Sequence, residues 1–163
     1  MIYVSADGAC RAGGYGSWAY VITRSTAARD VEVLAAASGL VEDTTNQRME
    51  ILAVTHGLEA AARLFTDEAV TVVSDSAYVI NCFREKWFVK WFANNWMTER
   101  GPVANQDAWQ LLFDVVGWLN SRREPMDLVL HPVVWQHVKG HAGHPTNELC
   151  DELCMEVLDR WAN

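Results

Sequence analysis

The chain has 163 residues, of which 50% are hydrophobic and 21% charged, so it holds enough apolar material for one compact domain and is not expected to be disordered. The formal net charge of −8 argues globally against a nucleic-acid partner, although a local basic or aromatic surface can override that argument. No apolar run is long enough to cross a membrane, and the first residues lack the basic segment of a secretory signal. The cysteines show no paired framework, and free thiols fit a reducing compartment. We therefore expect a soluble, cytoplasmic monomer with a single domain over residues 1–163.

Alternating apolar residues predict three strands in the first part of the chain. They cover residues 2–8, 17–22 and 31–37, and their short connections predict an antiparallel meander. Thr44 and Gln47 stand at the spacing of a capping box, so they are expected to open a helix that runs to about residue 64. That helix is apolar nearly all round, which is typical of a helix buried on several sides.

The second part of the chain alternates strands and helices. It is expected to contain a strand at 70–74, a helix around 78–83, an aromatic segment at 87–96, a helix at 108–119 that Asn105 can cap, and a strand at 129–138. A last helix starts at Pro145 and carries an apolar stripe of Cys150, Leu153, Cys154, Val157, Leu158 and Trp161. Three antiparallel strands followed by helix-linked strands predict a mixed α/β sheet with helices packed on it.

Acidic side chains are placed where a sheet of this kind forms sites. Asp7 and Asp75 are each predicted to end a strand, Glu50 lies in the early turns of the buried helix, and Asp151 lies at the rim of the last helix's stripe. A lone aspartate at a strand end commonly only forms a turn. Four acids in one pocket repel one another, and divalent cations that prefer oxygen ligands, such as Mg²⁺, relieve that repulsion. Two such ions would clamp a phosphodiester, so the spacing predicts a metal-dependent phosphodiesterase.

A zinc site is the rival interpretation of the last segment. His141, His144, Cys150 and Cys154 are zinc-type ligands, but their spacing matches none of the usual zinc motifs. Both cysteines fall on the apolar stripe. We therefore expect them to be core thiols.

The aromatic segment favours a nucleic-acid surface. Trp87 and Trp91 are spaced to share one helical face, and basic residues are interleaved with the aromatic ones: Arg84, Lys86, Lys90 and Arg100. Aromatic rings stack on bases and basic side chains contact phosphates. Core packing is the alternative, and it is favoured for Trp91.

Six segments, taken in order, resemble type 1 ribonuclease H. They are Asp7-Gly8, Gly-Gly-Tyr-Gly at 13–16, Thr-Thr-Asn-Gln-Arg-Met-Glu at 44–50, Ser-Asp-Ser-Ala-Tyr-Val at 74–79, the spaced tryptophans of 87–96, and VKGHAGHPTNELCD at 138–151. Each motif alone is modest, but the ordered set is specific and covers nearly the whole chain. The resemblance implies a ribonuclease H-like five-stranded mixed sheet in the order 3-2-1-4-5, flanked by helices and carrying a helical aromatic handle.

The resemblance also implies the chemistry. It implies endonucleolytic hydrolysis of the RNA strand of RNA–DNA hybrids, leaving 5′-phosphate and 3′-hydroxyl ends. Asp7, Glu50, Asp75 and Asp151 would hold two Mg²⁺ ions, with Mn²⁺ as a substitute, and His141 would assist proton transfer or product departure. The expected substrate contacts are Thr45, Asn46, Gln47, Ser76, Trp87, Trp91, Asn105 and Lys139.

Two departures from the family pattern bear on substrate affinity. The loop at 10–13 is shorter than usual and lacks an Asn-Pro-Gly portion, and the handle reads Phe92-Ala93-Asn94-Asn95 where lysine and arginine are usual. Two other functions stay open: a catalytically weak or silent hybrid-binding module, and another nuclease or integrase built on the same sheet. The intact acid set argues against a binding module, which has no use for four mutually repelling carboxylates.

Overall fold

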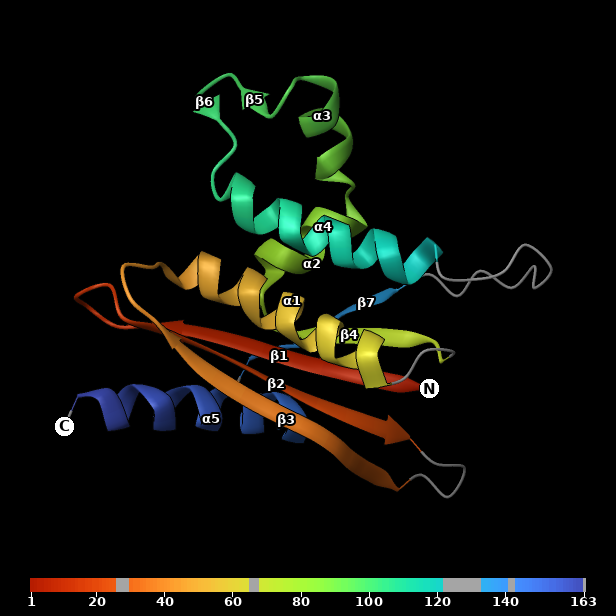
Figure 1. Ribbon diagram of the computed structural model, residues 1–163, viewed down its shortest axis with the longest axis vertical. Helices are drawn as coiled ribbons and strands as arrows, with labels where there is room; N and C mark the ends of the chain where they lie inside the picture. The colour runs from red at the N-terminus through yellow and green to blue at the C-terminus, as the bar shows by residue number, and fades with distance from the viewer. Residues whose placement is uncertain (26–29, 65–67, 122–132, 141–142, 163) are drawn as a thin grey trace.

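The computed structural model describes residues 1–25, 30–64, 68–121, 133–140 and 143–162. A sheet lies between two helical layers, with α1 and α4 on one face and α5 on the other (Figure 1). The aromatic segment rises above α4 as a separate projection, which we call the handle (residues 84–103). Within the described ranges, no helix combines the length and apolar character needed to cross a membrane.

The main sheet has five strands in the order β3-β2-β1-β4-β7. Their bounds are β1 Ile2–Cys10, β2 Gly16–Ser25, β3 Val31–Val41, β4 Val70–Ser74 and β7 Val134–His137. The first three strands pair antiparallel, whereas β1 with β4 and β4 with β7 pair parallel. Counted within this sheet, the order is 3-2-1-4-5, so the expected topology is confirmed.

Five helices accompany the sheet: α1 Asn46–Leu64, α2 Ala77–Arg84, α3 Trp87–Ala93, α4 Gln106–Ser121 and α5 Pro145–Trp161. Alternate residues of β1, namely Ile2, Val4 and Ala6, are fully buried in the core shared with α1 and α4. The opposite face of the sheet packs on α5 through a smaller cluster that contains Cys150 and Cys154. The two faces of β1 therefore serve two different helical layers, as strand alternation requires.

The start of α1 is tied to α4 by a two-pronged ion pair. Both guanidinium nitrogens of Arg48 lie 2.8 Å from the carboxylate oxygens of Asp107, and this contact brings the pKa of Asp107 down to about 2. Paired, parallel contacts of this kind fix orientation as well as distance. The first turn of α1 is thereby held in a defined position relative to the helix that supports the handle.

Several local expectations are corrected by the structure. The capping box at Thr44 and Gln47 is wrong, because the hydroxyl of Thr45 accepts the Arg48 N–H at 3.3 Å and α1 starts one residue later. Trp161 was expected on the buried stripe but is 52% exposed, because it lies on the last turn of α5, where the ring contacts Tyr15 at the rim of the sheet.

Strand and helix bounds also differ from expectation. β1 continues to Cys10, since antiparallel pairing with β2 runs on to the pair Cys10 and Gly16, so Asp7 lies inside a strand and does not end one. Of the predicted strand at 129–138, β7 covers 134–137 and residues 129–132 lie outside the described part. A short hairpin, β5 Met97–Thr98 and β6 Gly101–Pro102, was not predicted.

Candidate active site

Asp7 and Asp75 come together through the parallel pairing of β1 with β4. The last parallel pair is Ser5 with Val73, and each aspartate lies two residues further along its own strand direction. Beyond that pair the sheet opens, and β1 stays paired only with β2. The two carboxylates therefore flank the point where the parallel strands separate, which is the usual place for a site in an open α/β sheet.

Gly8 brings the start of α1 against β1. A Cβ at this position would lie 2.4 Å from the carbonyl carbon of Met49 and 2.5 Å from the backbone N of Glu50. These are rigid backbone atoms, so only glycine permits the approach. Asp7 and Glu50 are neighbours in space because Gly8 has no side chain.

Both carboxylate oxygens of Glu50 are held by hydrogen bonds. The Ser76 hydroxyl donates to Oε2 at 2.6 Å, and the Asn46 amide donates to Oε1 at 3.0 Å. The Ser76 oxygen also accepts the Val79 N–H and so caps α2. A single hydroxyl thus fixes both the helix that follows Asp75 and the orientation of Glu50.

Asp75 is enclosed by the segment that follows β7 and by the start of α5. A Cβ on Gly140 would lie 2.6 Å from Asp75 Oδ2, so this glycine makes room for the carboxylate. The Asn147 amide donates to the same oxygen at 3.4 Å, and His137 Nε2 lies 3.1 Å from the Asp75 carbonyl oxygen. Asp75 is therefore oriented by residues of the last strand and the last helix.

Asn147 was missed from the sequence. The side chain is 3% exposed, and Oδ1 is a buried oxygen without a hydrogen-bond partner among the described residues. A signal was present, because Asn147 stands three residues before Cys150 and continues the apolar stripe of α5 with a polar residue. Buried polar atoms without partners usually mark a bound water or ion, and this one lies beside Asp75.

The carboxylates act on one another electrostatically. Burial raises the pKa of Asp7 to about 7, and the negative charges of Asp75, Asp151 and Glu50 add to the rise, while the Gly8 N–H opposes it. Burial also raises the pKa of Glu50, the Ser76 hydrogen bond lowers it, and Asp75 raises it. All four expected acids therefore contribute to one negative site, with Asp151 supplied by α5.

The acid cluster is suited to a hydrated divalent ion. Among the described residues, no three His, Cys, Asp or Glu side chains already converge into a ready-made metal cage. Mg²⁺ rarely uses such a cage, since it binds through one or two carboxylates and keeps several waters. The raised pKa values of Asp7 and Glu50, caused first by burial and then by neighbouring carboxylates, fit such an ion, as does the open oxygen of Asn147, which can accept from a metal-bound water.

The zinc alternative finds no support in the thiols. Cys150 and Cys154 are fully buried and donate to the carbonyl oxygens of Ser5 and Asp7, at 3.3 Å each. Burial raises the pKa of Cys154 to about 12 and that of Cys150 higher still. Zinc binds thiolates, so these groups are core thiols as expected. His141 lies outside the described residues.

The expected substrate contacts differ in how far they are exposed. Thr45, Asn46 and Gln47 are exposed on the first turn of α1, and Lys139 is exposed next to Gly140. Ser76, by contrast, is 5% exposed, so its role in the structure is to hold Glu50 and α2.

The handle packs on α4 through aromatic rings. Trp91 lies within 5.5 to 6.3 Å of Trp109, Trp96, Trp87 and Phe113, measured between ring centroids, so this ring belongs largely to the packing. Trp87 is half-buried, and its indole N–H donates to Glu85.

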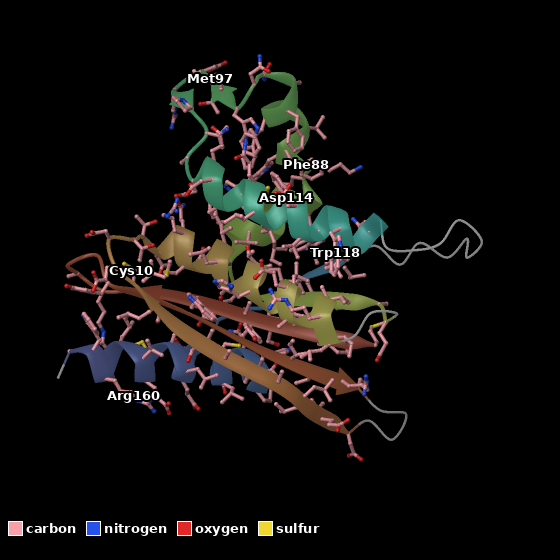
Figure 2. The ribbon with its side chains drawn as sticks, in the orientation of Figure 1. Cys10, Phe88, Met97, Asp114, Trp118 and Arg160 are labelled. Atoms are coloured by element: carbon pink, nitrogen blue, oxygen red, sulfur yellow. The ribbon has the colours of Figure 1, made fainter. Side chains whose placement is uncertain are left out.

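Tyr78 links Trp87 and Asn105, two of the expected substrate contacts. Its ring lies 6.2 Å from that of Trp87, measured between centroids, and its hydroxyl accepts from the Asn105 amide at 3.3 Å. Figure 2 shows the handle side chains from Phe88 up to Met97 standing above α4.

Comparison with known proteins gives a consistent family. The RNase H family model matches residues 1–159. A ribonuclease H of Thermoanaerobacter sp. (strain X514) is 39% identical over 162 residues, covering 98% of this chain and 91% of that protein. Among solved structures, LC9-RNase H1, described as a type 1 RNase H with the type 2 active-site motif, has a TM-score of 0.78 at 25% identity and covers 98% of this chain and 72% of its own.

A second solved structure shares the fold at lower identity. LC11-RNase H1, solved in complex with an RNA/DNA hybrid, has a TM-score of 0.69 at 18% identity, and the match covers 100% of both chains. The family model spans nearly the whole chain, and the relative at 39% identity does the same. The chain therefore belongs to the ribonuclease H family.

Proposed function

We propose that this ribonuclease H, which hydrolyses the RNA strand of RNA–DNA hybrids, cuts that strand internally with two Mg²⁺ ions held by Asp7, Glu50, Asp75 and Asp151. Mn²⁺ would substitute. The observation that carries the proposal is the meeting of Asp7 and Asp75 where β1 and β4 separate, with Glu50 brought against β1 at Gly8; burial and the neighbouring carboxylates raise the pKa of Asp7 to about 7. Such a site is costly unless a cation occupies it.

The side chains of the chain prepare this chemistry by holding the acids. When bound, two divalent ions supply the positive charge that activates a water and stabilises the leaving oxygen. Ser76 and Asn46 fix the two oxygens of Glu50, and the Gly8 N–H holds Asp7 Oδ1 at 2.8 Å. Asn147 orients Asp75 and offers its free oxygen to a water proton. Preorganised ligands of this kind need no rearrangement when the substrate arrives.

His141 is proposed to carry a proton on or off the reacting phosphate or its products. Its neighbours in sequence support this role, because Gly140 touches Asp75 and Gly143 has a φ of 78° that glycine adopts easily. The Gly143 N–H donates to Glu148 Oε1 at 3.1 Å, so the segment leads directly into the first turn of α5.

The hybrid is proposed to lie across the start of α1 and the handle. Thr45, Asn46 and Gln47 would contact one strand, and Asn105 with Trp87 the other, with Lys139 near a phosphate. Support comes from the Arg48–Asp107 ion pair and the Tyr78 contacts, which hold these two surfaces at a fixed separation. A protein with this fold has been solved with an RNA/DNA hybrid, so the fold accommodates such a ligand.

Cleavage of end-labelled duplexes tests the proposal. RNA–DNA, RNA–RNA and DNA–DNA substrates should be incubated with and without Mg²⁺, with Asp75→Asn as the inactive control. We expect internal cuts in the RNA of the hybrid alone, only with metal, leaving 5′-phosphate and 3′-hydroxyl ends. Equal cutting of DNA duplexes would contradict the proposal, and binding without cutting in either Mg²⁺ or Mn²⁺ would identify a silent hybrid-binding module.

We extend the proposal to the state of the protein in the cell. A single-domain monomer in the cytoplasm is supported by the five-stranded sheet, which joins strands from the first and the last parts of the described chain, and by the free cysteines among the described residues. Size-exclusion chromatography with light scattering tests the monomer.

A further inference from the structure

The turn between β1 and β2 is attached to the last turn of α5, which lies far from it in sequence. Arg11 forms an ion pair with Asp159, and the rings of Tyr15 and Trp161 lie 5.7 Å apart between centroids. Figure 2 shows Cys10, at the end of β1, and Arg160, near the end of α5, at the same end of the molecule. Two independent side-chain contacts thus join the C-terminal turn of α5 to the turn that follows β1, the strand that holds Asp7.

Backbone hydrogen bonds within the β1–β2 turn hold its residues together, so a displacement of one of them is passed to the others. The Arg11 N–H donates to the Tyr15 carbonyl at 2.8 Å, and the Gly14 N–H donates to the Arg11 carbonyl at 3.2 Å. Gly13 and Gly14 have φ angles of 101° and 84°, which favour glycine and fix the shape of the turn. Anchoring Arg11 and Tyr15 therefore also positions Gly14.

The other side of the same turn holds the segment before α1. The Thr44 N–H donates to the Gly14 carbonyl at 2.9 Å, and the Cys10 thiol lies 3.5 Å from the Thr44 carbonyl as a weak donor. Thr45 follows immediately and caps α1, and Asn46 bonds Glu50. A continuous chain of contacts thus runs from the last turn of α5 to the first turn of α1.

We infer that Asp159 and Trp161 are positioning residues, which act through the β1–β2 turn on Thr45 and Asn46, the first turn of α1 that contacts the hybrid. This inference rests on the proposed function. The local charge argues against direct phosphate contact, since Asp159 and, one turn earlier, Glu156 are both more than 60% exposed and Arg160 is paired with Glu156. Neither residue touches the reacting atoms, so their effect should fall on substrate binding.

Amide hydrogen exchange without substrate tests the contact chain directly. In Trp161→Ala and Asp159→Asn, the amides of Gly14 and Thr44 should exchange roughly two- to tenfold faster, which corresponds to losing one aromatic or ionic contact. The Ile2 amide, which donates to Ala69 in the core, should be unchanged and reports that the sheet is intact. Trp161→Phe, which keeps a ring, should restore wild-type exchange.

Steady-state kinetics on a hybrid give the second readout. For Trp161→Ala we expect KM to rise roughly three- to tenfold with kcat changed less than about twofold, because ground-state positioning is lost while the Ser76 hydroxyl still holds Glu50. Glu156→Gln is the matched control, since Glu156 is exposed one turn earlier on α5 and pairs within the helix, with Arg160 at 3.6 Å. Its KM and its amide exchange should equal those of the wild type.

The outcomes separate this inference from the proposed function. If the wild type does not cut the hybrid, the proposed function fails, while the exchange result still decides whether the contact chain exists. If the wild type cuts but Trp161→Ala and Asp159→Asn leave Gly14 exchange, Thr44 exchange and KM unchanged, the inference is overturned. If Trp161→Ala speeds exchange at Ile2 as well, Asp159→Asn and Trp161→Phe decide the question, because both keep the helix surface nearly intact.

Discussion

Asp7 within β1 and Asp75 just after β4 occupy equivalent positions relative to the parallel pairing of these strands, each two residues beyond the closing pair Ser5 and Val73. The register of the sheet is therefore sufficient to bring the two acids together. Glu50 and Asp151 join from helices on opposite faces of the sheet, as the two packing clusters require. The site is thus built at the junction of all three layers, which ties its electrostatics to the stability of the whole fold.

Asp7→Asn should stabilise the metal-free protein, and more so at higher pH. The folded-state pKa of Asp7 is about 7 against an ordinary value of 3.8, so the folded protein holds this proton more tightly than the unfolded chain. Ionisation of Asp7 therefore costs stability as the pH rises from about 4 through about 7, and asparagine avoids that cost. Denaturant unfolding in EDTA at pH 4, 6 and 8 measures the difference between the variant and the wild type.

The control for that experiment is Asp114→Asn, which removes an exposed carboxylate from α4. Its stability difference from the wild type should stay nearly flat across the same pH range. Activity should disappear in Asp7→Asn and persist in Asp114→Asn. A stability advantage of Asp7→Asn that shrinks between pH 4 and pH 8 would show that the folded structure does not raise the pKa of Asp7.

Ser76→Ala should weaken both the fold and the metal site. Loss of the cap on α2 costs about 1 kcal/mol, which lowers Tm by roughly 2–4 °C in a protein of this size. Glu50 loses its 2.6 Å hydrogen bond at the same time, so Mg²⁺ affinity should change. Thermal unfolding and Mg²⁺ titration by calorimetry measure the two effects, and Ser76→Thr, which keeps the hydroxyl, should retain both properties. Unaltered Mg²⁺ binding in Ser76→Ala would mean that this bond does not orient Glu50.

The sequence predicted the sheet well because its strands carry clear alternation and its motifs follow a known order. The position of Asp7 within its strand was harder to predict. The pairing of β1 with β2 continues past Asp7-Gly8, whereas the pairing of β1 with β4 stops before Asp7, and only the register of the folded sheet shows this difference. The β5–β6 hairpin was not predicted, because it follows Asn95 and Trp96, whose φ values are 49° and 61°. A tryptophan in the left-handed region is held there by its packing partners, which no local pattern reveals.

The acids of the site were predictable as residue types, whereas their supports were not. Asn147 was part of a quoted motif, yet a polar residue on an apolar stripe gains meaning only when Asp75 is seen beside it. Gly8 and Gly140 are also explained by what would collide with a side chain there. Such close approaches between distant segments are a property of the folded structure and leave no periodic signal in the sequence.

Gly140→Ala should damage catalysis more than stability. The new methyl would lie 2.6 Å from Asp75 Oδ2, which is the free end of a side chain and can move away. Displacing a proposed metal ligand by about 1 Å can cost on the order of 10²-fold in rate. Comparison of kcat and of Tm measures the two effects. Gly117→Ala is the control, because a Cβ there meets no atom within 4 Å, and it should be as active as the wild type. Full activity in Gly140→Ala would indicate that Asp75 need not hold its present position.

His141→Ala should slow turnover and leave the fold and Mg²⁺ affinity intact. A positioned general acid or base contributes about 10²–10⁴-fold, so a loss within that range is expected in kcat. His56→Ala is the control, since the His56 ring on α1 packs against Trp18, with 4.2 Å between ring centroids, and its Nδ1 lies 3.4 Å from Glu59 of the same helix. Collapse of Mg²⁺ affinity in His141→Ala would instead make this histidine a ligand and revive the zinc-type interpretation.

Adding positive charge to the handle should tighten hybrid binding and make it more sensitive to salt. Between Arg84 and Arg100 the handle has four basic and two acidic side chains within a chain of net charge −8, so few phosphates can be neutralised there. Asn95 is a poor site for a lysine, because its φ of 49° strains most side chains, whereas Asn94 has a φ of −107° and Val89 is 55% exposed. The variant to make is therefore Val89→Lys with Asn94→Lys.

Each new phosphate contact should steepen the log–log salt dependence of binding by roughly 0.7–0.9. KM for the hybrid, measured across ionic strength, should accordingly fall at low salt and converge on the wild-type value at high salt. Val31→Lys with Val33→Lys adds the same charge to the free edge of β3, at the end of the sheet away from the handle (Figure 1), where both valines are more than half exposed. This control should change KM far less, because charges more than about 10 Å away are screened at 0.1 M salt. If the handle variant and the edge variant shift KM equally, net charge alone governs binding, and the handle rings serve only to pack against α4.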